Sequence, residues 1–180
     1  LFVQPFDLRN LKVLGEASAV AENADLDVAR NLGGFTVSDT GTLAYPPGTQ
    51  TGRSQLVLLD RSGRRLGLIS EAGFMAEPEL SPDGKRAAVS ILDPASRIFQ
   101  VWLYDLMSGV GAPLTFGPSE NRFSIWSFDG TRVYFSSDRK GKGDIYVKPA
   151  SGAGAEEEVF RSSSMAYPTD CSRDGRFLVL

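Results

Sequence analysis

Short apolar runs separated by glycine-containing turns recur along the whole chain. Runs of this length, bounded by Gly, Pro, Asp and Ser, are typical of β-strands. No segment keeps the apolar spacing of about 3.6 residues that marks an amphipathic helix. The best helical candidate, the alanine-rich stretch 17–32, drifts out of that spacing, so we expect it to hold a strand and a linker. The pattern therefore predicts an all-β protein.

The turns themselves form a repeat. Four of them share the pattern Ser-x-x-Gly, at residues 38–41, 81–84, 127–130 and 172–175. Their glycines lie 43, 46 and 45 residues apart, which is the period of a four-stranded propeller blade. In Ser81-Pro82-Asp83-Gly84, proline presets the backbone angle φ, aspartate makes local hydrogen bonds and glycine supplies a positive φ. We expect each segment to be a tight turn between two antiparallel strands.

A second element recurs after each turn and completes the blade. Runs 55–60, 100–105 and 144–148 start 45 and 44 residues apart, and each is followed by a Ser-Gly loop and a weaker strand. The expected blades are 34–69, 76–116 and 121–160. Residues 1–21 align with the third and fourth strands of a blade, and residues 165–180 with the first and second. The prediction is a single β-propeller segment over residues 1–180, with three whole four-stranded antiparallel blades between two complementary half-blades. This is about four blades' worth of strands, and we expect it to be part of a larger ring.

The composition is that of a soluble globular protein. Apolar residues make up 42% and charged residues 23% of the sequence, a balance far from that of a disordered chain. The net charge of −3 argues against a nucleic acid or an anionic membrane surface as the main partner. No apolar stretch approaches the roughly 18 residues needed to span a bilayer. We therefore expect no nucleic-acid partner and no direct membrane insertion by this segment.

The chain lacks the residues that the commonest catalytic sites need. It contains no histidine and one cysteine, Cys171. This excludes a Ser-His-Asp triad, a histidine-based metal site and a disulfide within the chain. No G-x-S-x-G motif occurs, and Gly152-Ala153-Gly154-Ala155 lacks the third glycine of a dinucleotide-binding loop. We expect no enzyme activity, no cofactor and no metal site, and the sequence singles out no ligand-binding residue.

Several acidic segments have a structural interpretation beside a functional one. The recurring Asp83, Asp129 and Asp174 are interpreted as hydrogen-bonding residues of the turns rather than as metal ligands. Residues 22–27 are the nearest match to a calcium loop, but they lack the glycine of its sharp bend. The run Glu156-Glu157-Glu158 is interpreted as a charged edge strand that discourages aggregation.

A basic loop, two tryptophans and the single cysteine also have a structural interpretation. The basic loop 139–143 is interpreted as a solvated turn, with an anion contact as the alternative. Trp102 and Trp126 fall at matching strand positions, which favours core packing over ligand stacking. Cys171 takes the apolar position before a turn serine and is expected to be a buried, inert thiol.

These motifs resemble the TolB-like, WD-repeat-like propeller family. The resemblance rests on Leu80-Ser81-Pro82-Asp83-Gly84-Lys85 and on Ser136-Ser137-Asp138-Arg139 leading to Asp144-Ile145-Tyr146. More narrowly, Val3-Gln4-Pro5-Phe6-Asp7 and Tyr167-Pro168-Thr169-Asp170 are similar to the propeller sensor halves of bacterial serine/threonine protein kinases. In such proteins the propeller lies beyond a membrane helix. The resemblance thus implies an extracytoplasmic or periplasmic location, with a cytoplasmic one left open.

Two functions remain open at this stage. The favoured one is a non-catalytic binding or sensor module that recognises a protein, a peptide or a small ligand through its loops. The alternative is the gating propeller half of a prolyl-oligopeptidase-type serine peptidase, whose catalytic domain would lie outside this sequence. Because the chain begins with Leu1 and ends in strand-like sequence, we expect a piece of a longer protein. Its two half-blades could pair in a homodimer or by strand exchange.

Overall fold

A computed structural model describes residues 2–21, 26–27, 32–33, 35–38, 40–45, 53–141 and 143–180. All regular secondary structure in these ranges is β-strand, which confirms the all-β prediction. No helix in the described part of the chain is long and apolar enough to cross a membrane.

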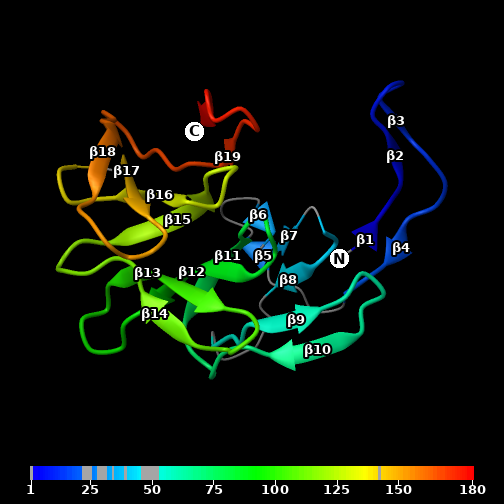
Figure 1. The fold of residues 1–180 in the computed structure, drawn as a ribbon, viewed down its shortest axis with the longest axis horizontal. Helices are drawn as coiled ribbons and strands as arrows, with labels where there is room; N and C mark the ends of the chain where they lie inside the picture. Colours follow the sequence, from blue (N-terminus) through cyan, green and yellow to red (C-terminus); the bar gives the residue numbers. More distant parts are fainter. Residues whose placement is uncertain are drawn as a thin grey trace.

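Three four-stranded antiparallel sheets form the body of the molecule (Figure 1). The first blade consists of β7 (Thr36–Val37), β8 (Leu43–Tyr45), β9 (Val57–Leu59) and β10 (Arg65–Leu68). The second consists of β11 (Met75–Leu80), β12 (Arg86–Leu92), β13 (Phe99–Asp105) and β14 (Gly111–Pro113). The third consists of β15 (Asn121–Trp126), β16 (Arg132–Ser137), β17 (Asp144–Pro149) and β18 (Glu157–Phe160). In each sheet the strands lie in sequence order, as in a propeller blade.

Two-stranded sheets account for the remaining strands. Near the N-terminus, β1 (Phe2–Val3) pairs with β4 (Ser18–Ala19), and the hairpin of β2 (Phe6–Asp7) and β3 (Lys12–Val13) lies between them in the sequence. The sequence did not indicate this second hairpin. Further along, β5 (Leu26–Asp27) pairs with β6 (Leu32–Gly33). At the other end, β19 (Asp170–Cys171) pairs with β20 (Leu178–Val179).

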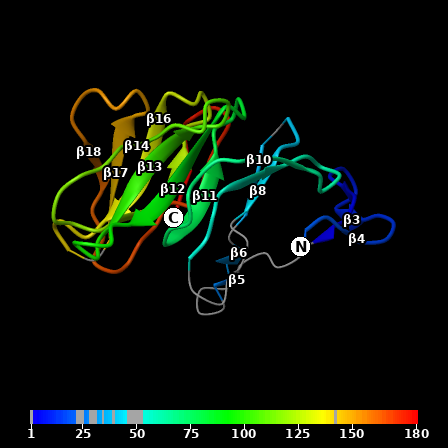
Figure 2. The same cartoon turned by 90° about the horizontal axis from the view of Figure 1, so that it is seen from below.

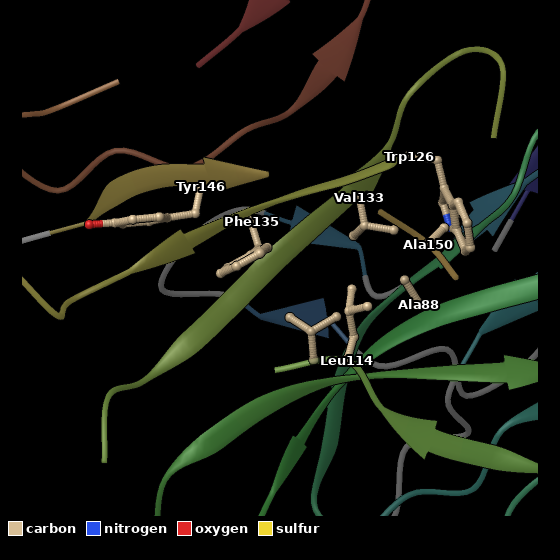
Figure 3. Close-up of a cluster of buried hydrophobic side chains, with 8 residues drawn as sticks. Ala88, Leu114, Trp126, Val133, Phe135, Tyr146 and Ala150 are labelled. Atoms are coloured by element: carbon tan, nitrogen blue, oxygen red, sulfur yellow. The ribbon is translucent and has the colours of Figure 1, made fainter. Parts of the chain in front are cut away.

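The second and third blades pack face to face through one apolar cluster (Figures 2 and 3). It contains Ala88, Val101 and Leu114 of the second blade with Trp126, Val133, Phe135, Tyr146 and Ala150 of the third. The rings of Phe135 and Tyr146 are stacked, with centroids 6.2 Å apart. Trp126 thus packs in the core as predicted. Trp102 is only half-buried and lies outside this cluster, so the core prediction was wrong for it.

A second cluster joins the first and second blades. It contains Ala44, Leu56 and Ile69 of the first blade with Leu80, Ala87, Val89 and Leu106 of the second. Along β12, Ala87 and Val89 therefore face the first blade while Ala88 faces the third. This alternation is what a strand with two buried faces requires, because successive side chains point to opposite sides of a sheet.

Candidate functional site

The first strands of four successive repeats, β7, β11, β15 and β19, lie next to one another in that order. Their carboxyl ends surround a cavity of about 450 Å³, which we call the mouth cavity. It is lined by the residues that precede the four turn serines, namely Val37, Leu80, Trp126 and Cys171, and by the beginnings of the turns. The repeat that defines the fold therefore also brings four chain segments to one cavity.

The turns are held by hydrogen bonds of the kind that the sequence predicts. In the second repeat, the Ser81 hydroxyl donates to Asp83 Oδ1 at 2.6 Å, and the Gly84 N–H donates to the Ser81 carbonyl at 2.8 Å. Gly84 has a φ of +68°, which glycine adopts without strain. The equivalent bond from Ser127 to Asp129 is also 2.6 Å long. Hydrogen bonds from Ser127 and then from Thr131 lower the pKa of Asp129 to about 2.

These contacts make the turn aspartates structural, as the sequence analysis proposed. In the first repeat a different side chain takes the same role, because the Ser38 hydroxyl lies 2.8 Å from Thr40 Oγ1. Within the described residues there is no group of three acidic, cysteine or histidine side chains that could hold a metal ion. The calcium-loop candidate 22–27 falls for the most part outside the described residues, and its last two residues form β5.

Two carboxylates line the mouth cavity. Glu79 of β11 and Asp170 of β19 both stand two residues before a turn serine, the position that Thr36 holds in β7 and Ile125 in β15. The Thr36 side chain hydrogen-bonds Glu79. Burial, with a smaller contribution from Asp170, raises the pKa of Glu79 to about 7. Sequence reasoning missed this pair, although the shared repeat position could have indicated it.

Aromatic side chains form another wall of the mouth cavity. Trp126 donates from Nε1 to the carbonyl oxygen of Glu79 at 3.1 Å, which fixes its ring against the second blade. The Arg86 guanidinium stacks on that ring at 4.6 Å from its centroid. Phe128 lies at the rim and is 43% exposed. The guanidinium carbon of Arg173 is 5.9 Å from the centroid of the Phe128 ring.

Cys171 lines the same cavity and is half-buried. The prediction of a buried thiol was therefore wrong, because the residue faces the cavity instead of an adjacent blade. Its sulfur lies 3.6 Å from the carbonyl oxygen of Ser172. It is the one cysteine of the sequence, so it offers a single chemical label at this position.

A smaller cavity of about 340 Å³ lies at the opposite ends of the inner strands, near the start of β15. Arg122 lines it, with its Nη2 2.6 Å from Glu77 Oε1 and its guanidinium 4.1 Å from the Phe99 ring centroid. Glu77 and Phe123 have φ of +56° and +54° at a bulge that recurs in two blades. The Phe123 N–H donates to Glu77 Oε2 at 3.2 Å. Since Glu77 neutralises Arg122 and fixes the bulge, this cluster is structural.

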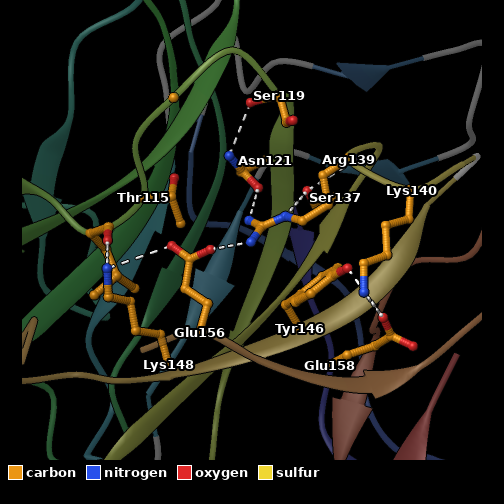
Figure 4. Close-up of polar contacts among 12 residues, drawn as sticks. Thr115, Ser119, Asn121, Ser137, Arg139, Lys140, Tyr146, Lys148, Glu156 and Glu158 are labelled. Atoms are coloured by element: carbon orange, nitrogen blue, oxygen red, sulfur yellow. Dashed lines mark hydrogen bonds and ion pairs between the residues drawn. The ribbon is translucent and has the colours of Figure 1, made fainter. Parts of the chain in front are cut away.

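The basic loop and the acidic run belong to one ion-pair network of the third blade, which lies against the second blade (Figure 4). Arg139 Nη1 lies 2.5 Å from Glu156 Oε2, and Lys148 Nζ lies 3.5 Å from Glu156 Oε1. Lys148 Nζ also donates to the carbonyl oxygen of Leu114 at 2.7 Å. Arg139 and Glu156 are mostly buried, so their interpretation as parts of a solvated turn and an exposed edge strand was wrong.

The rest of the acidic run behaves as a charged edge. Glu157 and Glu158 lie on β18, which is paired on one side with β17 alone. Glu158 lies 3.0 Å from Lys140 Nζ and 2.9 Å from Arg161 Nη2. Hydrogen bonds from Arg161 and Lys140 lower the pKa of Glu158 to about 2. The charge of Lys140 is thus already matched within the protein.

Comparison with known proteins places this arrangement in a family. An uncharacterized peptidase of Bacillus subtilis, YuxL, is 30% identical over 88 residues, which are 46% of this chain and 13% of that protein. An uncharacterized protein of Agrobacterium fabrum is 29% identical over 121 residues, 67% of this chain and 41% of that protein. The structure of putative TolB from Agrobacterium tumefaciens has 27% identity and a TM-score of 0.67 over 76% of this chain and 48% of that chain.

The chain thus spans less than half the length of each of these relatives. The sequence model of the TolB beta propeller domain matches residues 36–180. That range contains the three whole blades, the four Ser-x-x-Gly turns and β19–β20. The chain therefore belongs to the TolB β-propeller family.

Proposed function

We propose that this chain is a non-catalytic binding module that recognises a protein, peptide or small ligand in a sensor role. The mouth cavity carries the proposal, because four inner strands end together around about 450 Å³, where charged and hydroxyl side chains converge beside the rings of Trp126 and Phe128. Convergent polar groups that fix the orientation of a ligand are a feature of binding sites. Membership of the TolB family supports a binding role. The lack of histidine argues against hydrolytic chemistry of the serine-triad type.

A selection experiment tests this function. Random peptides displayed on phage are selected for binding to the full chain. The affinity of each selected peptide is then measured for the unaltered chain, for Phe128→Ala at the cavity rim and for the control Phe116→Ala. Phe116 is 65% exposed and does not line the mouth cavity. We expect Phe128→Ala to weaken binding about tenfold and Phe116→Ala to leave it unchanged. The proposal fails if no peptide is enriched, or if the purified chain turns over a substrate.

The alternative is a gating propeller of a prolyl-oligopeptidase-type serine peptidase. The similarity to the Bacillus subtilis peptidase favours it. The coding sequence on both sides of this segment separates the two functions. A downstream hydrolase with a G-x-S-x-G motif supports the gate, whereas a kinase domain upstream supports a sensor that lies outside the cytoplasm.

Pairing of the two-stranded sheets is a separate proposal. The β1–β4 and β19–β20 sheets correspond to complementary halves of a blade. We propose that they join within one chain or between two chains. Light scattering of the full chain tests this. A homodimer supports exchange between chains, a compact monomer supports closure within the chain, and an extended monomer contradicts both.

A further inference from the structure

We propose that the mouth cavity binds a cationic group, the ammonium of a lysine side chain or the guanidinium of an arginine side chain in a peptide ligand, between Glu79 and Asp170. This inference rests on the proposed binding function and specifies the chemistry of its ligand. The two carboxylates come from β11 and β19, with β15 between them. They therefore approach the cavity from two sides.

These two carboxylates are not matched by a cation of the described part of the chain. Neither Glu79 nor Asp170 forms an ion pair with any residue in the described ranges. In contrast, the partly buried Glu77 and Glu156 each contact an arginine. A partly buried carboxylate is costly unless a cation or hydrogen-bond donors compensate it. Glu79 is half-buried and has the Thr36 side chain as a hydrogen-bond partner, so no cation of the described residues balances its charge. Asp170 is exposed, and its Oδ1 accepts from the Cys171 N–H at 2.7 Å.

The cations near the mouth cavity, Arg86 and Arg173, already have partners. Arg86 donates to the carbonyl oxygens of Gly130 and Ala150 at 2.8 and 3.2 Å and stacks on Trp126. Arg173 lies at the rim beside Phe128 and forms further interactions of its own. A ligand cation would thus be the group that balances the carboxylates.

The walls of the mouth cavity suit a long cationic side chain. Phe128 exposes part of its ring at the rim, and aromatic faces attract cations and the methylene groups beside them. Leu80 and Pro82 add apolar surface. A cavity of about 450 Å³ has room for a side chain with an apolar stem and a charged head.

The charge of Glu79 makes the binding dependent on pH. Its pKa is raised to about 7 by burial and by Asp170. A cation binds the ionised carboxylate, so affinity should rise as the pH increases through about 7 and fall when Glu79 is protonated. Among the described residues, Thr36 of β7 and Asp170 of β19 act on the Glu79 carboxyl, and Arg173 is the positively charged residue that lines the same cavity.

The single cysteine provides the measurement. Because Cys171 lines the mouth cavity and is the one thiol of the sequence, its rate of alkylation by iodoacetamide reports occupancy of that cavity. The probes are acetyl-Gly-Lys-Gly-amide, its arginine analogue and its neutral glutamine analogue. At each pH, the rate of Cys171 alkylation with the probe is divided by the rate without it. Protonation of the thiol affects both rates equally and therefore cancels in this ratio. Backbone NMR shifts give the affinity independently.

We expect the lysine and arginine probes to slow Cys171 alkylation at pH 8 and the glutamine probe to leave it unchanged. Glu79→Gln and Asp170→Asn should each lower the affinity for the lysine and arginine probes about tenfold. This is the usual effect of losing one partner of a charge-assisted hydrogen bond. Glu71→Gln, which changes an exposed carboxyl outside the cavity, is the matched control. Lowering the pH from 8 to 6 should lower the affinity of the unaltered chain for the lysine and arginine probes.

Three outcomes overturn the inference. They are equal protection by the glutamine probe, unchanged affinity in both carboxylate variants, and no protection by any probe at tens of millimolar. If either variant fails to fold, the pH profile of the unaltered chain decides. Suppose that peptides selected by phage display bind at Phe128 but contain no lysine or arginine. This result would refute the proposal of a cationic ligand and would leave the binding function standing. Absence of any selected peptide would refute the binding function itself.

Discussion

Replacement of Glu156 by glutamine should destabilise the protein strongly, although glutamate at this position looked like part of a solvated edge. Glu156 contacts Arg139 at 2.5 Å and Lys148 at 3.5 Å. The side chains of Lys148, Glu156 and Arg139 are 9%, 14% and 25% exposed. Glutamine keeps the shape and removes the charge. The two cations, Arg139 and Lys148, would then lose the anion that both of them contact.

The size of the effect follows from burial. Breaking a fully buried ion pair by removing one partner costs about 3–5 kcal/mol, because the other charge is left uncompensated. All three side chains here keep some contact with water, and Lys148 and Arg139 keep their bonds to the Leu114 carbonyl and to Asn121. We therefore expect the free energy of unfolding to fall by about 2–3 kcal/mol. Removing one cation as well, by Lys148→Met, should restore part of the loss.

Urea denaturation followed by circular dichroism measures these changes. Glu157→Gln is the matched control, because Glu157 directly follows Glu156 in the sequence, begins β18 and is exposed. It should leave the urea midpoint unchanged. The reasoning is refuted if Glu156→Gln costs less than about 0.5 kcal/mol, the usual scale of a surface change, or if it matches the control.

Three further predictions use the same assay. Because burial raises the pKa of Glu79 from 4.5 to about 7, the folded protein binds the proton more tightly than the unfolded chain. Stability should thus fall as pH rises from about 4.5 to 7 by roughly 3 kcal/mol, at about 1.4 kcal/mol for each pKa unit, and Glu79→Gln should remove that fall. Leu11 is 75% exposed with a φ of +51°, so Leu11→Gly should stabilise by about 0.5–1 kcal/mol, whereas Leu8→Gly should destabilise. Phe135→Ala, at a fully buried position, should cost about 3–5 kcal/mol, and Phe128→Ala at the exposed rim less than about 1 kcal/mol. A flat pH profile, a loss of stability in Leu11→Gly, or equal costs for the two phenylalanines would contradict the respective argument.

The sequence predicted the blades well because their strands and turns depend on local chemistry. Ser81, Asp83 and Gly84 close their turn with bonds that span a few residues. The apolar runs between such turns have strand length, and each of the three whole blades forms the four strands expected. The period of the turns was therefore enough to identify the repeat.

Side chains that meet only through tertiary packing could not be assigned in the same way. Glu156 and Arg139 are 17 residues apart in the sequence, yet they form one ion pair inside the protein. Cys171 looked buried by analogy with Trp126, but it faces the mouth cavity. The carboxylates of Glu79 and Asp170 are two repeats apart and come to one cavity because the inner strands lie next to one another.

The sequence by itself determined that this protein is a run of four-stranded blades closed by Ser-x-x-Gly turns, and that it lacks the histidine of common catalytic sites. The tertiary structure decided which charged and aromatic side chains are buried together. It joined Arg139 to Glu156 and brought Glu79 and Asp170 to the mouth cavity. The physical reason is that turns and strands form through contacts close in sequence, whereas burial and electrostatic pairing depend on how the strands of a blade and the neighbouring blades pack together.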